Sequence, residues 1–234
     1  MTLRLPRRAV GAAVGLALLA AVSGCNDNNP AEPGDTAPKH GLVAIIGDSY
    51  MAGADPADPG SGMAGKVADD LGMYLSNFSI GGTGYLRGGP TGTEEYGTQA
   101  KLAVKSKANL YVVYGGANDW IGIYQGGSQT LDELATAARG VFATLSNVAR
   151  KAHVVIVGPI WPPVTPDPGI LKIRDVLKQE AEAAGLTFID PIAEGWLTVD
   201  NLDDLIGPDN IHPSAAGNIY FAKKIADAVD GAIH

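Results

Sequence analysis

Short apolar runs alternate along the chain with longer segments in which apolar residues recur every three or four positions. Continuous apolar runs are typical of parallel strands that are buried on both faces of a sheet. We therefore predict five β-strands, the second being the weakest: Leu42–Ile46, Leu75–Ile80, Leu110–Tyr114, His153–Val157 and Leu186–Ile189.

The segments between these runs have the periodicity of amphipathic helices. One of them opens on Thr130-Leu131-Asp132-Glu133, a capping-box pattern that marks a helix start. The predicted helices cover Gly62–Leu71, Thr130 to about Lys151, Gly169–Ala184 and Ser214–Ala232. Alternating strands and helices predict an α/β fold, a three-layer α/β/α sandwich, with two long loops at Thr83–Thr98 and Pro159–Pro168.

The first 24 residues have the three-part layout of a secretory signal peptide. Arg4, Arg7 and Arg8 precede the apolar run Ala9–Val22, and small residues follow it. This run has about 14 residues, fewer than the roughly 20 that span a bilayer. A removed signal peptide, residues 1–24, is therefore favoured over a permanent transmembrane anchor.

The signal ends in Val22-Ser23-Gly24-Cys25, which resembles the lipobox of bacterial lipoproteins. The resemblance implies cleavage before Cys25, lipid attachment to that residue, and an extracytoplasmic, membrane-anchored lipoprotein. The alternative is plain signal cleavage that leaves a free thiol, and with a single cysteine no intramolecular disulfide is possible. Residues 26–40 are rich in Asn, Pro, Asp and Gly, which predicts that residues 25–40 form a flexible tether.

The rest of the chain, residues 41–234, is long enough for one domain with a sizeable core. The chain carries 25 acidic and 17 basic side chains, and loss of the three signal arginines leaves 14 basic ones and a net charge near −11. No cluster of Lys and Arg remains, which argues against nucleic acid as a partner and against charge-driven binding to anionic lipid. We expect a monomer that contacts a membrane only through its anchor at Cys25.

Polar residues follow several predicted strands, at the sheet edge where open α/β sheets bind their ligands. Ser49 follows the first strand, the glycine-rich stretch Gly81–Gly84 follows the second, and Asn118 follows the third. Asp209 and His212 come just before the last helix. We expect the topology to bring all of these residues to one edge of the sheet.

These residue types fit nucleophilic attack on a carbonyl group. Ser49 would be the nucleophile, His212 its general base, and Asp209 the carboxylate that orients the imidazole. The oxyanion donors would be the backbone N–H groups of Ser49 and Gly82 and the side-chain amide of Asn118.

Each motif alone also has a purely structural explanation. Gly47-Asp48-Ser49 fits a helix cap, the glycines fit a turn with positive φ, and the segment around Asn118 fits an Asx turn. Asp209 and His212 fit a cap on the last helix. Their occurrence together, in this order and each after the appropriate element, favours a catalytic site.

Four sequence blocks together resemble those of the GDSL, or SGNH, hydrolases: IIGDSYMAG, NFSIGGTGY, YGGANDW and DNIHPSAAG. The resemblance covers about residues 41–232. It implies a five-stranded parallel sheet in a flavodoxin-like order and hydrolysis of acyl esters without a cofactor. The matched site residues are Ser49, Gly82, Asn118, Asp209 and His212, with Gly81 as the alternative register for the oxyanion glycine.

Two positions depart from the family pattern. Tyr50 stands where an aliphatic residue usually follows the serine, and Ser79 stands where the glycine block often has its first glycine. Because neither residue supplies a catalytic atom, we expect the departures to affect the shape of the substrate site.

Two other hydrolase classes fit the sequence less well. The α/β-hydrolase elbow reads G-x-S-x-G, whereas Met51 stands at the place of its second glycine. A metal hydrolase needs several ligands at fixed spacing, but His40 falls in the tether, His153 opens a strand and His234 is the last residue. We therefore expect no metal and no other cofactor.

The sequence thus predicts a serine esterase that acts on short-chain or cell-envelope-linked acyl esters. Its substrate would be a small-molecule, glycan or glycolipid ester, and Trp120, Trp161 and Tyr50 are the weaker candidates for substrate binding. Two alternatives stay open. One is an acyltransferase that moves an acyl group between envelope glycans or glycolipids, and the other is a catalytically inactive carbohydrate-binding module.

Overall fold

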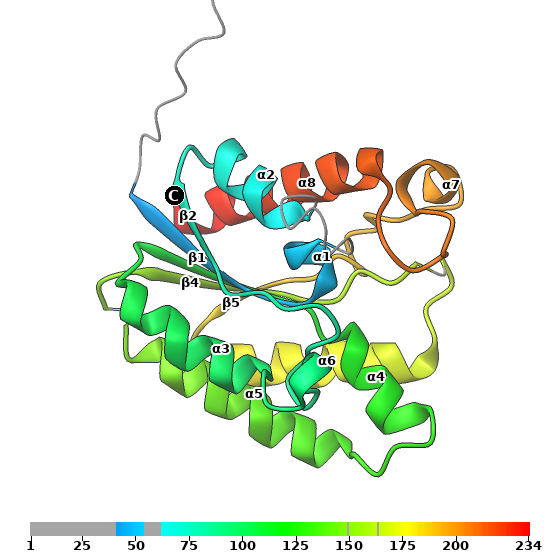
Figure 1. Cartoon of the computed structure of the whole chain (residues 1–234), viewed down its shortest axis with the longest axis horizontal. Helices are drawn as coiled ribbons and strands as arrows, with labels where there is room; N and C mark the ends of the chain where they lie inside the picture. Colours follow the sequence, from blue (N-terminus) through cyan, green and yellow to red (C-terminus); the bar gives the residue numbers. More distant parts are fainter. Residues whose placement is uncertain (1–40, 54–61, 149, 163) are drawn as a thin grey trace, which may run out of the picture. The chain divides into compact units, whose positions relative to one another are not determined.

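The protein contains a five-stranded parallel sheet in the order β2-β1-β3-β4-β5 (Figure 1). The structure is a computed structural model that describes residues 41–53, 62–148, 150–162 and 164–234. The strands are β1 (Leu42–Ile46), β2 (Tyr74–Asn77), β3 (Leu110–Tyr114), β4 (His153–Val157) and β5 (Thr187–Ile189). This is the flavodoxin-like order, so the predicted fold class is confirmed.

Helices cover both faces of this sheet (Figure 1). On one face lie α1 (Ser49–Ala52), α2 (Met63–Asp70), α7 (Leu202–Leu205) and α8 (Ala215–Ile233). On the other lie α3 (Tyr96–Ala103), α4 (Ala117–Tyr124), α5 (Leu131–Ser146) and α6 (Pro168–Ala183). Two short 3₁₀ helices, Gly89–Thr91 and Val104–Ser106, lie in the connections before and after α3.

The two layers explain why the strands read as continuous apolar runs. Alternate residues of a strand point to opposite faces of a sheet. In β1, Val43 and Ile45 join a buried cluster with α2 and α8, whereas Ala44 and Ile46 join a second cluster with α3, α5 and α6. Burial on both faces therefore requires an apolar residue at every position.

The predicted bounds hold for β1, β3 and β4, while the two edge strands are shorter than predicted. β2 ends at Asn77 rather than at Ile80, because the Asn77 side chain accepts a hydrogen bond from the N–H of Ser79 at 3.0 Å and turns the chain. β5 begins one residue late, at Thr187.

The helix predictions differ from the structure mainly in the loops and at one helix end. The capping box at Thr130 is present, but α5 ends at Ser146, about five residues before the predicted end near Lys151. α3 begins at Tyr96, inside the segment predicted as a long loop. α4 and α7 fall outside the predicted helices. The four residues of α7 are too few to show a helical period, and α4 begins in the stretch around Asn118 that also fits an Asx turn.

The predicted signal peptide, residues 1–24, and the predicted tether with Cys25 lie outside the described residues. Within the described part of the chain, no helix has the length and apolar character needed to cross a membrane.

Candidate active site

The predicted nucleophile begins a helix at the carboxyl end of β1. Gly47 and Asp48 leave the strand, and Ser49 is the first residue of α1. The Asp48 carboxylate caps this helix by accepting a hydrogen bond from the N–H of Tyr50 at 3.0 Å. The cap fixes the turn, so that Ser49 stands at the edge of the sheet with its side chain in a cavity.

The structure brings Ser49, His212 and Asp209 into one hydrogen-bonded chain. The Nε2 atom of His212 lies 2.9 Å from the Ser49 Oγ, and its Nδ1 atom lies 2.6 Å from the Asp209 Oδ2. The hydrogen bond from His212 and the N–H groups of Ile211 and His212 lower the pKa of Asp209 to about 2. An anionic carboxylate at Nδ1 favours the tautomer with its proton there, which leaves the Nε2 lone pair facing the serine.

A closed loop holds His212 in this position. Ile206 and Pro213 form an antiparallel bridge, and the N–H of Gly207 donates to the His212 carbonyl at 2.7 Å. At the tip, Asn210 adopts a left-handed conformation with a φ of 59°, which asparagine tolerates better than most residues.

Tyr50, predicted as a weak substrate-binding residue, contacts this loop from beneath. Its hydroxyl donates a hydrogen bond to the Ile211 carbonyl at 2.5 Å, and its ring stacks on Tyr114 with centroids 5.7 Å apart. Only 7% of Tyr50 is exposed, although it borders the cavity. Its contacts therefore fit a residue that positions the His212 loop, a role that an aliphatic residue would not fill.

The predicted oxyanion donors lie around the same cavity. Ser49, Gly81, Gly82 and Asn118 all line it. Among the described residues, the backbone N–H groups of Ser49, Gly81 and Gly82 have no recorded acceptor, so they remain available to a ligand. Gly82 has a φ of +75°, which lies in the left-handed region that favours glycine. Gly81 lies next to the serine, since a Cβ placed on Gly81 would be 3.7 Å from the Ser49 Cβ.

Beneath the cavity, a buried polar network joins the serine block, the glycine block and the asparagine block. The Asn118 side-chain amide donates to the Thr83 carbonyl at 2.9 Å, and the Thr83 hydroxyl donates to the Gly47 carbonyl at 3.0 Å. Gln99 accepts from the N–H of Gly47 at 3.1 Å and donates to Thr83 Oγ1 at 2.9 Å. These bonds fix the glycine block relative to the serine and the asparagine.

Two buried carboxylates lie behind the site. Asp119 accepts hydrogen bonds from the N–H groups of Tyr85 at 3.0 Å and Leu86 at 2.8 Å, and it thereby holds the loop after the glycine block. Burial raises the pKa of Asp119 from 3.8 to about 6. Burial, with the nearby Asp119 carboxylate as a smaller cause, raises the pKa of Asp48 to about 7.

We expect the folded state to lose stability as the pH rises from 5 to 8. Between the ordinary value of 3.8 and its folded value of about 7, Asp48 binds more protons in the folded than in the unfolded protein. This contribution to stability is fully present only below pH 3.8, and it is lost progressively as the pH rises from there through about 7. One pKa unit corresponds to about 1.4 kcal/mol, which in a domain of this size moves Tm by about 3 °C or more.

The measurement is Tm at pH 5 and pH 8 for wild type, Asp48→Asn and the exposed control Asp200→Asn. Asparagine keeps an oxygen for the Tyr50 N–H but does not ionise, so the Tm difference between the two pH values should shrink in Asp48→Asn alone. An unchanged difference in that variant would show that Asp48 is not its cause.

The Ser49 cavity, defined by the residues that line it around Ser49, has a volume of about 870 Å³ and mostly apolar walls. Trp120 and Trp161 both line it and pack edge to face, with centroids 5.3 Å apart. The Trp120 Nε1 donates to the Asp167 carboxylate at 2.8 Å, which fixes the indole. Ile121 and Pro90 extend the apolar wall.

Sequence reasoning missed Gln99 and Asp119, because one buried amide on a helix gives no pattern and the carboxylate reads as part of an Asx turn. The described residues include no group of three or more His, Cys, Asp or Glu side chains arranged to hold a metal ion.

Comparison with known proteins places the chain in one family. A model of the GDSL-like lipase/acylhydrolase family matches residues 45–218. GDSL lipase Rv0518 of Mycobacterium tuberculosis is 34% identical over 194 residues, which cover 80% of each protein.

Solved structures share the fold at lower identity. An acetyl xylan esterase, AlAXEase, matches with a TM-score of 0.62 at 19% identity, over 80% of this chain and 99% of its own. A lipase/acylhydrolase from Enterococcus faecalis matches with a TM-score of 0.59 at 17% identity, over 81% and 95%. With the family match over most of its length, the chain belongs to the GDSL-like lipase/acylhydrolase family of ester hydrolases.

Proposed function

We propose that the protein is a serine esterase that forms an acyl-serine intermediate at Ser49. The observation that carries the proposal is the hydrogen-bonded chain from Ser49 through His212 to Asp209, with its serine end in an apolar cavity. A serine hydroxyl is a weak nucleophile until an adjacent base takes its proton, and a base 2.9 Å from Oγ is within reach of that proton.

In the first half of the reaction, the Ser49 Oγ attacks the acyl carbonyl carbon and its proton passes to His212 Nε2. The carbonyl oxygen becomes an oxyanion held by the N–H of Ser49, the N–H of Gly82 or Gly81, and the Asn118 amide. The intermediate collapses, the bond to the alcohol oxygen breaks, and His212 returns the proton to the leaving alkoxide.

In the second half, water attacks the acyl-serine carbonyl while His212 takes one of its protons. Collapse of this second intermediate breaks the bond to Ser49 Oγ, which recovers its proton from His212, and the carboxylic acid leaves. Asp209 stays ionised throughout because the pKa of its carboxyl group is about 2, so it stabilises the imidazolium formed in each half.

The substrate we propose is a short-chain or envelope-linked acyl ester. The apolar wall of Trp120, Trp161 and Ile121 suits an acyl chain, since apolar surface removed from water stabilises the complex. The names of the relatives, a GDSL lipase and an acetyl xylan esterase, agree with ester substrates of different kinds. Anchoring through lipid at Cys25 after removal of residues 1–24, which the lipobox resemblance supports, would place the enzyme beside envelope esters.

A panel of p-nitrophenyl esters tests this function. We expect hydrolysis of the acetate, butyrate and octanoate. We expect kcat/KM for laurate and palmitate to be at least about tenfold lower, because the packed side chains of Trp120 and Trp161 limit how far an extended chain runs along the cavity wall. The measurement is the initial rate of p-nitrophenol release below the solubility limit of each ester.

Two outcomes would favour the alternatives. No hydrolysis of any ester in the panel by a folded protein would favour the inactive carbohydrate-binding module. Slow hydrolysis that becomes severalfold faster when a sugar acceptor is added, with acylated sugar as the product, would favour the acyltransferase.

A further inference from the structure

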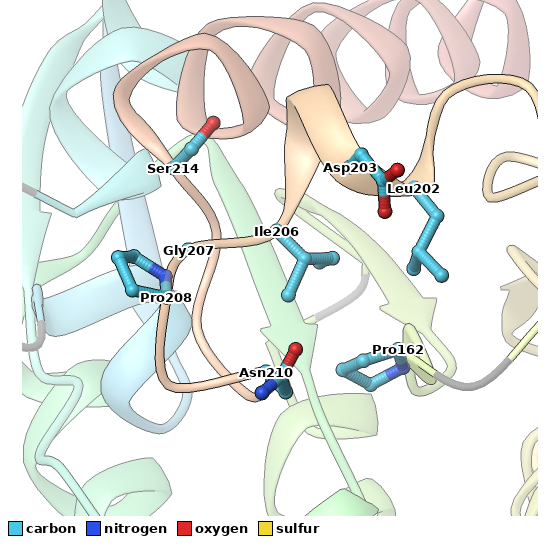
Figure 2. Close-up of a pocket in the computed structure, with 8 residues that line it drawn as sticks. All are labelled: Pro162, Leu202, Asp203, Ile206, Gly207, Pro208, Asn210 and Ser214. Carbon is cyan, nitrogen blue, oxygen red and sulfur yellow. The ribbon is translucent and has the colours of Figure 1, made fainter.

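A second cavity, of about 660 Å³, lies beside the Ser49 cavity on the side of the His212 loop. Figure 2 shows the residues that line it: Pro162, Leu202, Asp203, Ile206, Gly207, Pro208, Asn210 and Ser214. Pro162 and Asn210 line both cavities. In the view of Figure 2 these two side chains lie at one end of the second cavity, and Asp203 and Ser214 lie at the other. The two cavities are therefore neighbours that share a border.

The chemistry of the reaction decides which part of an ester points toward this second cavity. His212 must exchange a proton with both the Ser49 Oγ and the oxygen of the leaving alcohol, so the alcohol lies on the His212 side of the serine. The carbonyl oxygen of the acyl group must instead face the oxyanion donors, Asn118 and Gly82 or Gly81. The second cavity borders the loop that carries His212, and its shared residue Asn210 is two positions from that histidine.

The lining of the second cavity combines free polar groups with apolar walls. Among the described residues, no hydrogen bond or ion pair is recorded for the Asp203 carboxylate or for the Asn210 side-chain amide. Leu202 and Ile206 form an apolar wall between these two polar side chains. Hydroxyl groups fit the free carboxylate and amide, and the C–H face of a sugar ring fits the apolar wall.

We propose that the second cavity is a leaving-group subsite that binds the alcohol part of the ester, a sugar ring with free hydroxyls. The sugar then lies between Leu202 and the His212 loop, and the Asp203 carboxylate accepts a hydrogen bond from one of its hydroxyls. This inference rests on the proposed serine esterase function, because only a reaction with a departing alcohol needs such a subsite.

The test compares two acetates of primary alcohols, 6-O-acetylglucose and ethyl acetate, through kcat/KM for acetate release. Both substrates are soluble and carry the same acyl group, so their ratio reports the alcohol alone. We expect wild type to favour the sugar ester by at least about tenfold. Leu202→Trp fills the cavity and should lower this ratio by about tenfold, and Asp203→Asn should lower it by about fivefold.

Asp204→Asn is the matched control, because Asp204 is the exposed neighbour of Asp203 in α7 and does not line either cavity. This variant should keep the wild-type ratio. A ratio that stays at the wild-type value in both Leu202→Trp and Asp203→Asn would overturn the subsite. Asp203 is exposed, so Asp203→Asn decides the question even if a melting curve shows that Leu202→Trp does not fold.

The Ser49→Ala variant separates this inference from the function on which it rests. Loss of hydrolysis of both acetates in Ser49→Ala, together with an unchanged ratio in the two subsite variants, would leave the esterase in place and remove only the subsite. Retained hydrolysis in Ser49→Ala would remove both.

Discussion

Replacing Ser49 by alanine is expected to lower kcat for p-nitrophenyl butyrate by at least about a thousandfold. The substitution removes the only atom that forms the proposed acyl bond. Catalysis that remains would come from binding and from the oxyanion donors acting on water, which in serine hydrolases leaves a small residual rate.

The Ser49→Ala protein should fold normally, so a loss of rate will report chemistry. Within the described part of the chain, the only hydrogen bond of the Ser49 hydroxyl joins it to His212, and the cap of α1 belongs to Asp48. A melting curve checks the folding. Ser146→Ala is a matched control, because the Ser146 hydroxyl at the end of α5 makes no hydrogen bond to another described residue and alanine suits a helix.

A fluorophosphonate probe gives a second readout of the same prediction. The probe reacts with an activated serine, so one adduct per chain should appear in wild type and in Ser146→Ala, and the labelled peptide should contain Ser49. Ser49→Ala should remain unlabelled. Equal rates for Ser49→Ala and wild type, or an adduct on another serine, would contradict the proposed nucleophile.

The placement of the site follows from the order of the strands. In a parallel sheet with the order β2-β1-β3, segments that follow neighbouring strands emerge at the same edge. Ser49, Gly82 and Asn118 each follow one of these strands, which is why the distant sequence blocks could be expected to meet. A half-buried serine beside an aspartate at the end of β1 is thus explained by the residues that follow the neighbouring strands β2 and β3.

The sequence predicted those parts of the structure that depend on local pattern. β1 and β3 are apolar at every position because both faces are buried, and Thr130 with Glu133 forms the predicted capping box. The pattern could not predict where β2 stops, because a single side-chain bond from Asn77 ends it.

Long-range contacts account for what the sequence could not predict. The contact of Tyr50 with the Ile211 carbonyl joins residues 161 positions apart, and Gln99 reaches the nucleophile turn from 52 positions away. The second cavity likewise depends on how α7 and the loop after β4 pack together. No periodicity or motif records such pairings, since they form only when the whole sheet is assembled.

Replacing His212 by alanine is expected to lower kcat by at least about a thousandfold as well, because no other base contacts the Ser49 hydroxyl among the described residues. His153→Ala is the control, since His153 is exposed at the start of β4. Loss of the imidazole should not unfold the protein, because Asp209 keeps its hydrogen bonds from the N–H groups of residues 211 and 212.

The double variant Ser49→Ala/His212→Ala gives the sharpest form of this prediction. If serine and histidine act as one unit, removing both should cost about as much as removing either, because the base has no function without the hydroxyl that it deprotonates. Initial rates of the two single variants and the double variant, measured with p-nitrophenyl butyrate, complete the cycle. If the loss of rate in the double variant equals the product of the two single losses, the two residues contribute independently. The hydrogen bond of 2.9 Å between Ser49 and His212 would then not be the one that transfers the proton in catalysis.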